Sequence, residues 1–233
     1  MPVTDATSAT TATSSTSLPA GFRERGGDIS RVEGFADCAF GFAVTLLVVS
    51  LEVPKTFDGL VEVLHGIPSF ALSFSILGWI WFTQFRFFRR YGLEDVVTVL
   101  LTLALLFAVL CYVYPLKFLY AVSLGSGDLT EHDLRVLFVI YGVGLATVFV
   151  VLALMFANAY RQRDRLGLDT LELADTRIQI AQLLGVAAIG LASSAVALLP
   201  IPNFELYAGF TYCLNAVVYA VGGRRRGALR RAA

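Results

Sequence analysis

Hydrophobic residues occur along this chain in long continuous runs that short polar segments separate. A helix needs about 20 predominantly apolar residues to cross a ~30 Å hydrocarbon core, and the runs approach that length. They are continuous rather than alternating, which favours helices over the strands of a membrane barrel. The pattern therefore predicts an all-α membrane protein with six transmembrane helices, at residues 34–53, 64–84, 96–116, 134–157, 177–199 and 204–222.

The composition excludes an ordinary cytosolic enzyme. Of the 233 residues, 57% are hydrophobic and 15% are charged, and the mean hydropathy is +0.71. A soluble domain carries roughly 25% charged residues. The sequence has no phosphate-binding loop, dinucleotide fingerprint, G-x-S-x-G turn or H-E-x-x-H pair. Its three cysteines and two histidines are dispersed, so no metal site is predicted. We expect no enzymatic activity, no cofactor and no nucleic-acid partner.

The 18 basic and 18 acidic side chains cancel in number, but the basic ones are distributed unevenly. Fifteen of them lie before the first predicted span, after the second, between the fourth and fifth, or after the last. The remaining loops contain only Lys55, Lys117 and Arg135. The positive-inside rule therefore predicts that both termini and the even-numbered loops are cytoplasmic. An even number of spans requires the same placement of the termini.

The chain ends differ in composition from the spans. Ten of the fourteen residues from Thr4 to Ser17 are Ser or Thr, and no signal-peptide pattern is present. Such a segment buries too little apolar surface to offset its ordering entropy. We therefore predict a disordered cytoplasmic tail at 1–28, a six-helix transmembrane domain at 29–223, and a basic cytoplasmic tail at 224–233.

The first span contains an acidic residue, Asp37, close to its start. A carboxylate inside the membrane is costly and needs a partner. Arg31 and Asp37 are six residues apart, so on one helix they point about 120° away from each other. Each is therefore expected to pair with another span. Alternatively, Asp37 caps the helix N-terminus, where a carboxylate also suits the helix dipole.

Further along the same span, Phe42, Thr45, Leu46 and Val49 follow i, i+3, i+4, i+7 spacing and share one helix face. From the pattern alone, such a stripe is more often ordinary packing than a functional surface. In the predicted fifth span, Ala181, Gly185, Ala188 and Ala192 form a small-residue pattern that lets helices approach closely. Four polar side chains are candidates for hydrogen bonds between helices there: Gln179, Gln182, Ser193 and Ser194.

Two stretches carry a resemblance to a known family. Arg31, Phe35 and Asp37, followed by Thr45-Leu46-Leu47 and closing in Pro54, resemble the first-helix signature of the transmembrane protein 175 family of potassium channels. The stretch 69–89 resembles the family's second helix through Ser73, Phe74, Gly78, Trp81, Arg86 and Phe88. Two departures remove polar partners: Ala36 stands where the family has serine, and Gln84 with Phe85 replaces a histidine pair.

The resemblance implies a homotetramer in the bilayer, with four copies of the first helix around a central pore. The family uses no TVGYG carbonyl filter, and this chain contains none. Apolar rings and a threonine hydroxyl serve instead, which here assigns the constriction to Phe42, Thr45, Leu46 and Val49. The same resemblance gives Arg31, Phe35 and Asp37 a structural role. Glu52 lies where four copies could concentrate cations at the pore mouth, although a solvated helix end explains it equally well.

The implied function is a potassium-permeable leak channel in a bacterial plasma membrane, with potassium and other monovalent cations as permeant ions. A secondary transporter of a small solute or ion is the alternative. We find no repeat between spans 1–3 and 4–6, and Asp37 is expected nearer the interface than the midplane, unlike a typical transporter site. A non-conducting packing subunit is the third possibility, and the polar Thr45 beside the stripe argues against it.

Overall fold

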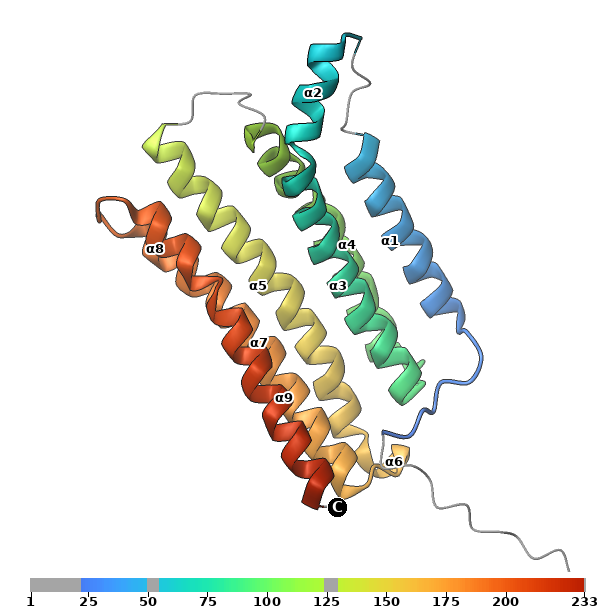
Figure 1. Ribbon diagram of the computed structural model, residues 1–233. Helices are drawn as coiled ribbons and strands as arrows, with labels where there is room; N and C mark the ends of the chain where they lie inside the picture. Colours follow the sequence, from blue (N-terminus) through green and yellow to red (C-terminus); the bar gives the residue numbers. More distant parts are fainter. Residues whose placement is uncertain (1–21, 50–54, 124–129, 233) are drawn as a thin grey trace, which may run out of the picture.

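The computed structural model describes residues 22–49, 55–123 and 130–232. Within these ranges the chain forms helices and no strand (Figure 1). The helices are α1 (Arg31–Val49), α2 (Phe57–His65), α3 (Ile67–Tyr91), α4 (Val96–Ser123), α5 (Glu131–Arg161), α6 (Arg163–Leu166), α7 (Thr170–Leu198), α8 (Phe204–Thr211) and α9 (Leu214–Ala232).

Among the described residues, five helical segments are long and apolar enough to cross a membrane. Four lie in α1, α4, α5 and α7, and the fifth is the segment Phe204–Leu229, which joins α8 and α9. α2 and α3 are bent by 45° relative to each other and together form a sixth candidate. The prediction of a six-helix membrane protein is confirmed when this bent pair counts as one span.

The helices lie side by side in a bundle, with α1 along one edge and α8 and α9 along the opposite edge (Figure 1). α5 packs against α4 and α7, α9 packs against α7, and α1 packs against α3 and α4. Large side chains such as Leu105, Leu152 and Phe156 are fully buried in the core. Because α1 lies at an edge, only one of its faces contacts the bundle.

α5 and α7 approach each other closely at Gly142 and Gly190. A Cβ atom on Gly190 would lie 2.7 Å from the Gly142 carbonyl oxygen, closer than real Cβ contacts come. Of the small residues expected to face a neighbour, Ala181, Ala188 and Ala192 are exposed, whereas a Cβ on Gly185 would lie 3.1 Å from the Val218 side chain of α9. Small residues at four-residue spacing occur on two faces of α7, and their spacing alone does not identify the face that meets a neighbour.

The polar side chains of α7 do bond between helices, as predicted. Ser193 Oγ donates to the Ala208 carbonyl at 2.9 Å, and Ser194 Oγ donates to the Val139 carbonyl at 3.3 Å. Gln179 Oε1 accepts hydrogen bonds from Arg86 on α3 and Arg226 on α9. Such bonds satisfy polar groups that would otherwise face hydrocarbon.

Three helices extend beyond the predicted spans at one end of the bundle. α3 continues to Tyr91 instead of ending at 84, α7 begins at Thr170 instead of 177, and α9 runs to Ala232. The basic clusters expected in loops and in the terminal tail therefore lie largely on helices. Helices continue there because long arginine side chains reach the interface and find polar partners on neighbouring helices.

The two ends of the described chain lie at this same end of the bundle (Figure 1). Residues 22–28, expected to belong to the disordered tail, form defined contacts here, while residues 1–21 lie outside the described residues. Arg25 donates to both carboxylate oxygens of Glu172 on α7, at 3.0 and 2.6 Å, and to the Leu166 carbonyl. The backbone nitrogens of Arg25 and Gly26 donate to the Arg89 carbonyl near the end of α3. This segment therefore links the start of α1 to α3 and α7.

Asp95 fastens the start of α4 to α5. Its carboxylate accepts a 2.7 Å hydrogen bond from Thr98 Oγ1 and weaker ones from Asn158 Nδ2 on α5. Partial burial raises the pKa of Asp95, but hydrogen bonds from Thr98, Gln162 and Asn158 outweigh it, so the pKa lies below its ordinary value. Asp95 is therefore held as a charged acceptor at neutral pH.

Candidate functional site

α1 presents two faces of different character. The buried residues recur every three or four positions on the side that contacts α3 and α4: Glu33, Ala36, Phe40, Ala43 and Leu47. On the other side, Phe35, Phe42 and Val49 follow at seven-residue intervals, with side chains that are 58%, 59% and 70% exposed. A seven-residue step turns a helix by only about 20°, so these three side chains form one apolar stripe.

The structure brings three of the four predicted constriction residues together on this exposed face: Phe42, Thr45 and Val49. Leu46 is half-buried and packs against the hydrophobic core, at the margin of the face. Phe35, for which a structural role is expected, lies on the exposed stripe. Glu52, the predicted pore-mouth residue, falls outside the described residues.

Thr45 is the polar group on the exposed face between Phe42 and Val49. Its Oγ1 donates a 2.8 Å hydrogen bond to the Gly41 carbonyl, one helical turn earlier. A hydroxyl has one proton and two acceptor lone pairs, so this bond occupies the proton and leaves the oxygen as an acceptor. An exposed oxygen of this kind suits a cation. No carboxylate or metal-ligating group is needed for that contact.

Asp37 lies in the second turn of α1 and is bonded to another helix. The Trp81 indole Nε1 on α3 donates a hydrogen bond of 2.8 Å to Asp37 Oδ1. The helix start is capped instead by Ser30, whose Oγ accepts a 3.1 Å bond from the Glu33 backbone nitrogen. The predicted inter-helix partner for Asp37 is thus present, and the N-cap alternative is wrong. Arg31 is exposed and forms no ion pair within the described ranges.

The sequence analysis did not identify Trp81 as the partner of Asp37. An indole N–H within an apolar run needs a hydrogen-bond acceptor, and this requirement could have indicated that Trp81 pairs with a polar side chain of another span. Its ring also stacks on Phe85, with centroids 5.7 Å apart and planes inclined by 25°. Gln84, which replaces a histidine of the family pattern, is buried, and its Nε2 has no hydrogen-bond partner among the described residues. This amide nitrogen therefore adds no bond between the first two spans.

Among the described residues, no group of three or more His, Cys, Asp or Glu side chains could hold a metal ion. The arrangement on α1 can do something different: it offers an apolar surface with one hydroxyl oxygen, on a helix at the edge of the bundle. Several such surfaces facing one another would enclose a narrow apolar passage. One protomer alone encloses none.

The chain is similar in sequence to several known proteins. Residues 31–115 match the family described as "Endosomal/lysosomal potassium channel TMEM175". A potassium channel of Marivirga tractuosa is 36% identical over 225 residues, which cover 89% of this chain and 91% of that protein. A potassium channel of Streptomyces collinus is 33% identical over 92 residues, 36% of this chain and 44% of that protein.

A solved structure is also similar over most of the fold. It is the crystal structure of a threonine-to-alanine variant of the potassium channel MtTMEM175, in complex with a Nanobody–MBP fusion protein. The TM-score is 0.75 at 35% sequence identity, and the match covers 87% of this chain and 95% of that one. The likeness therefore extends over nearly the whole bundle, well beyond the first three spans.

Proposed function

The chain belongs to the TMEM175 family of potassium channels, and from this premise we propose that it conducts potassium passively through a pore lined by α1 of four copies. One observation carries the proposal. The exposed face of α1 places Phe42, Thr45 and Val49 on a helix at the edge of the bundle, where most of their surface lacks a partner within the protomer. Assembly into a cyclic homotetramer covers this face and, at the same time, encloses a pathway for ions.

In this pore, the apolar side chains gate by excluding water. A narrow apolar ring holds water poorly, and the passage closes to ions when it dries. Four Phe42 rings fill more space than four aliphatic side chains would, so Phe42 forms the tightest point. Val49 forms a second apolar ring about two turns away, and Leu46 supports the helix from the margin of the core.

Thr45 supplies the polar contact for the ion. Its hydroxyl proton is bonded to Gly41, and four oxygens directed at one axis replace part of the hydration shell of a potassium ion. Discrimination by such a ring is weaker than by a carbonyl cage, because few ligands are offered. Glu52 concentrates cations at the outer mouth. The permeant ion is the only ligand that this mechanism requires.

The proposed orientation follows from the basic end of the bundle. This end, with both chain termini, faces the cytoplasm of a bacterium whose plasma membrane holds the protein. Fifteen of the 18 basic residues lie in the segments that this orientation makes cytoplasmic. Lys55, Lys117 and Arg135 lie in segments that it makes external.

Flux measurements on liposomes test the function. The purified full chain is reconstituted with a potassium gradient, and we expect passive potassium flux that follows the gradient and needs no second solute. Saturable flux coupled to another solute would support the secondary transporter instead. Empty liposomes and a solubilised, heat-denatured sample are the controls. A complete lack of flux from correctly folded protein would leave only a packing role.

The constriction is tested by two substitutions. Phe42→Ala is expected to widen and wet the pore, which raises the current several-fold and weakens the preference for potassium over sodium. Thr45→Ala is expected to keep the opening but lower selectivity, because it removes a hydroxyl ligand without adding bulk. Bilayer recordings of single channels measure both quantities.

Phe107→Ala is the matched control, since Phe107 is an exposed phenylalanine on a different helix, α4. It should leave conductance and selectivity unchanged. If Phe42→Ala also leaves both unchanged, the constriction lies elsewhere and the α1 face is ordinary packing.

A further inference from the structure

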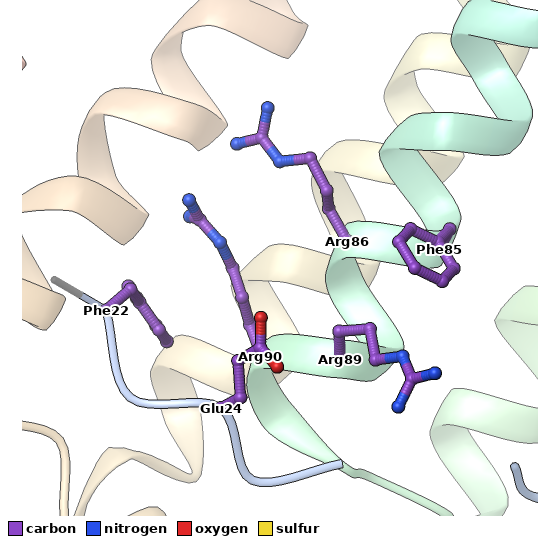
Figure 2. Close-up of a pocket in the computed structure, with 6 residues that line it drawn as sticks. All are labelled: Phe22, Glu24, Phe85, Arg86, Arg89 and Arg90. Carbon is purple, nitrogen blue, oxygen red and sulfur yellow. The ribbon is translucent and has the colours of Figure 1, made fainter. Parts of the chain in front are cut away.

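A cavity of about 380 Å³ lies beside the last turns of α3, at the end of the bundle where the basic residues gather. Its lining combines side chains of α3 with two from the segment before α1: Phe22, Glu24, Phe85, Arg86, Arg89 and Arg90. Figure 2 shows Arg86 and Arg90 extending to one side of α3 and Arg89 to the other. Three arginines and one glutamate therefore contribute to the lining, and the guanidinium of Arg89 is directed away from those of Arg86 and Arg90.

The basic side chains behind this cavity share a small set of acceptors on α7. Asp175 on α7 is shared by two of them, Arg90 at 2.5 Å and Arg226 of α9 at 2.7 Å. Gln179 Oε1, a neutral acceptor, receives hydrogen bonds from both Arg86 and Arg226, at 3.2 and 2.6 Å. Arg86 and Arg90 thus share their acceptors on α7 with Arg226, which also donates to Gln182 Oε1 at 2.6 Å.

Arg86 and Arg89 have donors available for a ligand. Within the described ranges, neither side chain forms an ion pair. Arg89 Nη1 donates to the Gly27 carbonyl at 3.2 Å, and its guanidinium lies 5.5 Å from the centroid of the Phe85 ring. A guanidinium carries five N–H donors in a planar fork that matches the oxygens of a phosphate group. These contacts occupy only part of that capacity.

We propose that this cavity binds the phosphate group of an anionic phospholipid at the membrane surface. Basic pockets between transmembrane helices on the cytoplasmic side are suited to anionic headgroups. Arginines hold the phosphate with charge-assisted hydrogen bonds. The exposed aromatic side chains Trp81 and Phe82 continue from Phe85 along α3 towards the apolar part of the helix, and the acyl chains pack there.

A free phosphate ion shares the same chemistry, so the experiment distinguishes the two sources. The purified full chain is titrated in a mild detergent with phosphatidylglycerol, with phosphatidylcholine, or with inorganic phosphate. Native mass spectrometry counts bound lipid, and the thermal midpoint of unfolding reports stabilisation. Neither readout depends on ion conduction, so failure of the proposed channel function leaves this result unaffected.

Three variants test whether the side chains that line the cavity determine the affinity for lipid. Each basic residue near an anionic lipid contributes about fivefold in affinity, so Arg86→Gln with Arg89→Gln should weaken phosphatidylglycerol binding about twenty-fivefold. Glu24→Gln removes the carboxylate from the lining and should tighten binding about fivefold. Glu24 is exposed, so this variant keeps the test valid if the double variant folds poorly. Arg225→Gln, an exposed arginine of α9 outside the cavity, is the matched control and should change little.

The proposal is supported if phosphatidylglycerol binds and stabilises more than phosphatidylcholine, and if the variants shift binding in these opposite directions. If inorganic phosphate alone reproduces the stabilisation and the arginine variants abolish it, the site takes free phosphate and the lipid assignment is wrong. Equal binding of both lipids, or no response to Glu24→Gln and to the double variant Arg86→Gln with Arg89→Gln, overturns the proposal.

Discussion

Asp37 and Trp81 join the first helix to α3 through a single hydrogen bond of 2.8 Å. Asp37 points away from the Phe42–Val49 stripe by about 120–140°, given a step of 100° per residue. A residue in that direction holds α1 in place but does not touch an ion on the other side. The hydroxyl of Thr45 and the carboxylate of Asp37 therefore have separate roles, although both are polar groups of the same helix.

We predict that Asp37→Ala lowers thermal stability and the yield of assembled protein more than it changes ion selectivity. The Trp81 N–H then loses its acceptor, which costs about 1–3 kcal/mol for a polar group away from water. Asp37→Asn is the matched control, because an amide oxygen still accepts the bond. Unfolding midpoints and bilayer recordings of the variants measure the two effects.

A double-mutant cycle with Trp81→Phe isolates the pair, and contacting residues of this kind couple by about 0.5–3 kcal/mol. Normal assembly of Asp37→Ala together with a lost potassium preference would place Asp37 on the ion path. In that case the assigned rotation of α1 is wrong.

At the scale of helices, the sequence determined the number and type of elements well because each span is a long apolar run. The helix ends were less predictable. α3 and α7 continue past their apolar runs, since Arg90 on one and Asp175 on the other form a bond that no local pattern contains. The ordered structure of residues 22–28 was unpredictable for the same reason. Arg25 forms an ion pair with Glu172, which is distant in the sequence.

The candidate site was predictable in part for the same reason. The spacing of Phe42, Thr45 and Val49 on one helix is a local property, and the structure keeps them on one face. That Leu46 turns towards the core depends on where α3 and α4 lie, which the sequence of α1 does not contain. The partner of Asp37 could likewise not be read from spacing, because Trp81 lies on another helix.

The crossing of α5 and α7 yields a prediction at this scale. We expect Gly142→Ala to destabilise the protein by about 1–3 kcal/mol, because overpacking forces packed helices apart. The added Cβ would overlap the Ser194 hydroxyl and the Gly190 carbonyl oxygen. Thermal unfolding in detergent, followed by circular dichroism, measures the change.

Gly209→Ala in α8 serves as the control, since a Cβ there meets no atom within 4 Å. Alanine is the better helix former, by about 1 kcal/mol, so this variant should be neutral or slightly stabilised. If Gly142→Ala is tolerated as well as Gly209→Ala, α5 and α7 are not held at the close separation described.

The position of α1 in the protomer determines which surface is available for assembly. α1 lies at one edge, and its apolar stripe carries three side chains that are more than half exposed. Cys38 is exposed and lies between Phe35 and Phe42 on the same side of the helix. Cys111 and Cys213 are also exposed, but they belong to other parts of the bundle. Cys38 is thus a native thiol that a cross-linking reagent can modify, on the face that is proposed to surround the pore.

We predict a homotetramer whose mass by native mass spectrometry is four times that of the 25.3 kDa chain. A pore needs several copies of a single lining stripe, and closed cyclic symmetry supplies them. In a variant that keeps only Cys38, a short bis-maleimide should join pairs of protomers, because four copies of this face surround one axis. A variant that keeps only Cys111 should give far less cross-linked product. A stable monomer across several mild detergents contradicts the assembly, whereas a tetramer that cross-links through Cys111 but not Cys38 places a different helix at its centre.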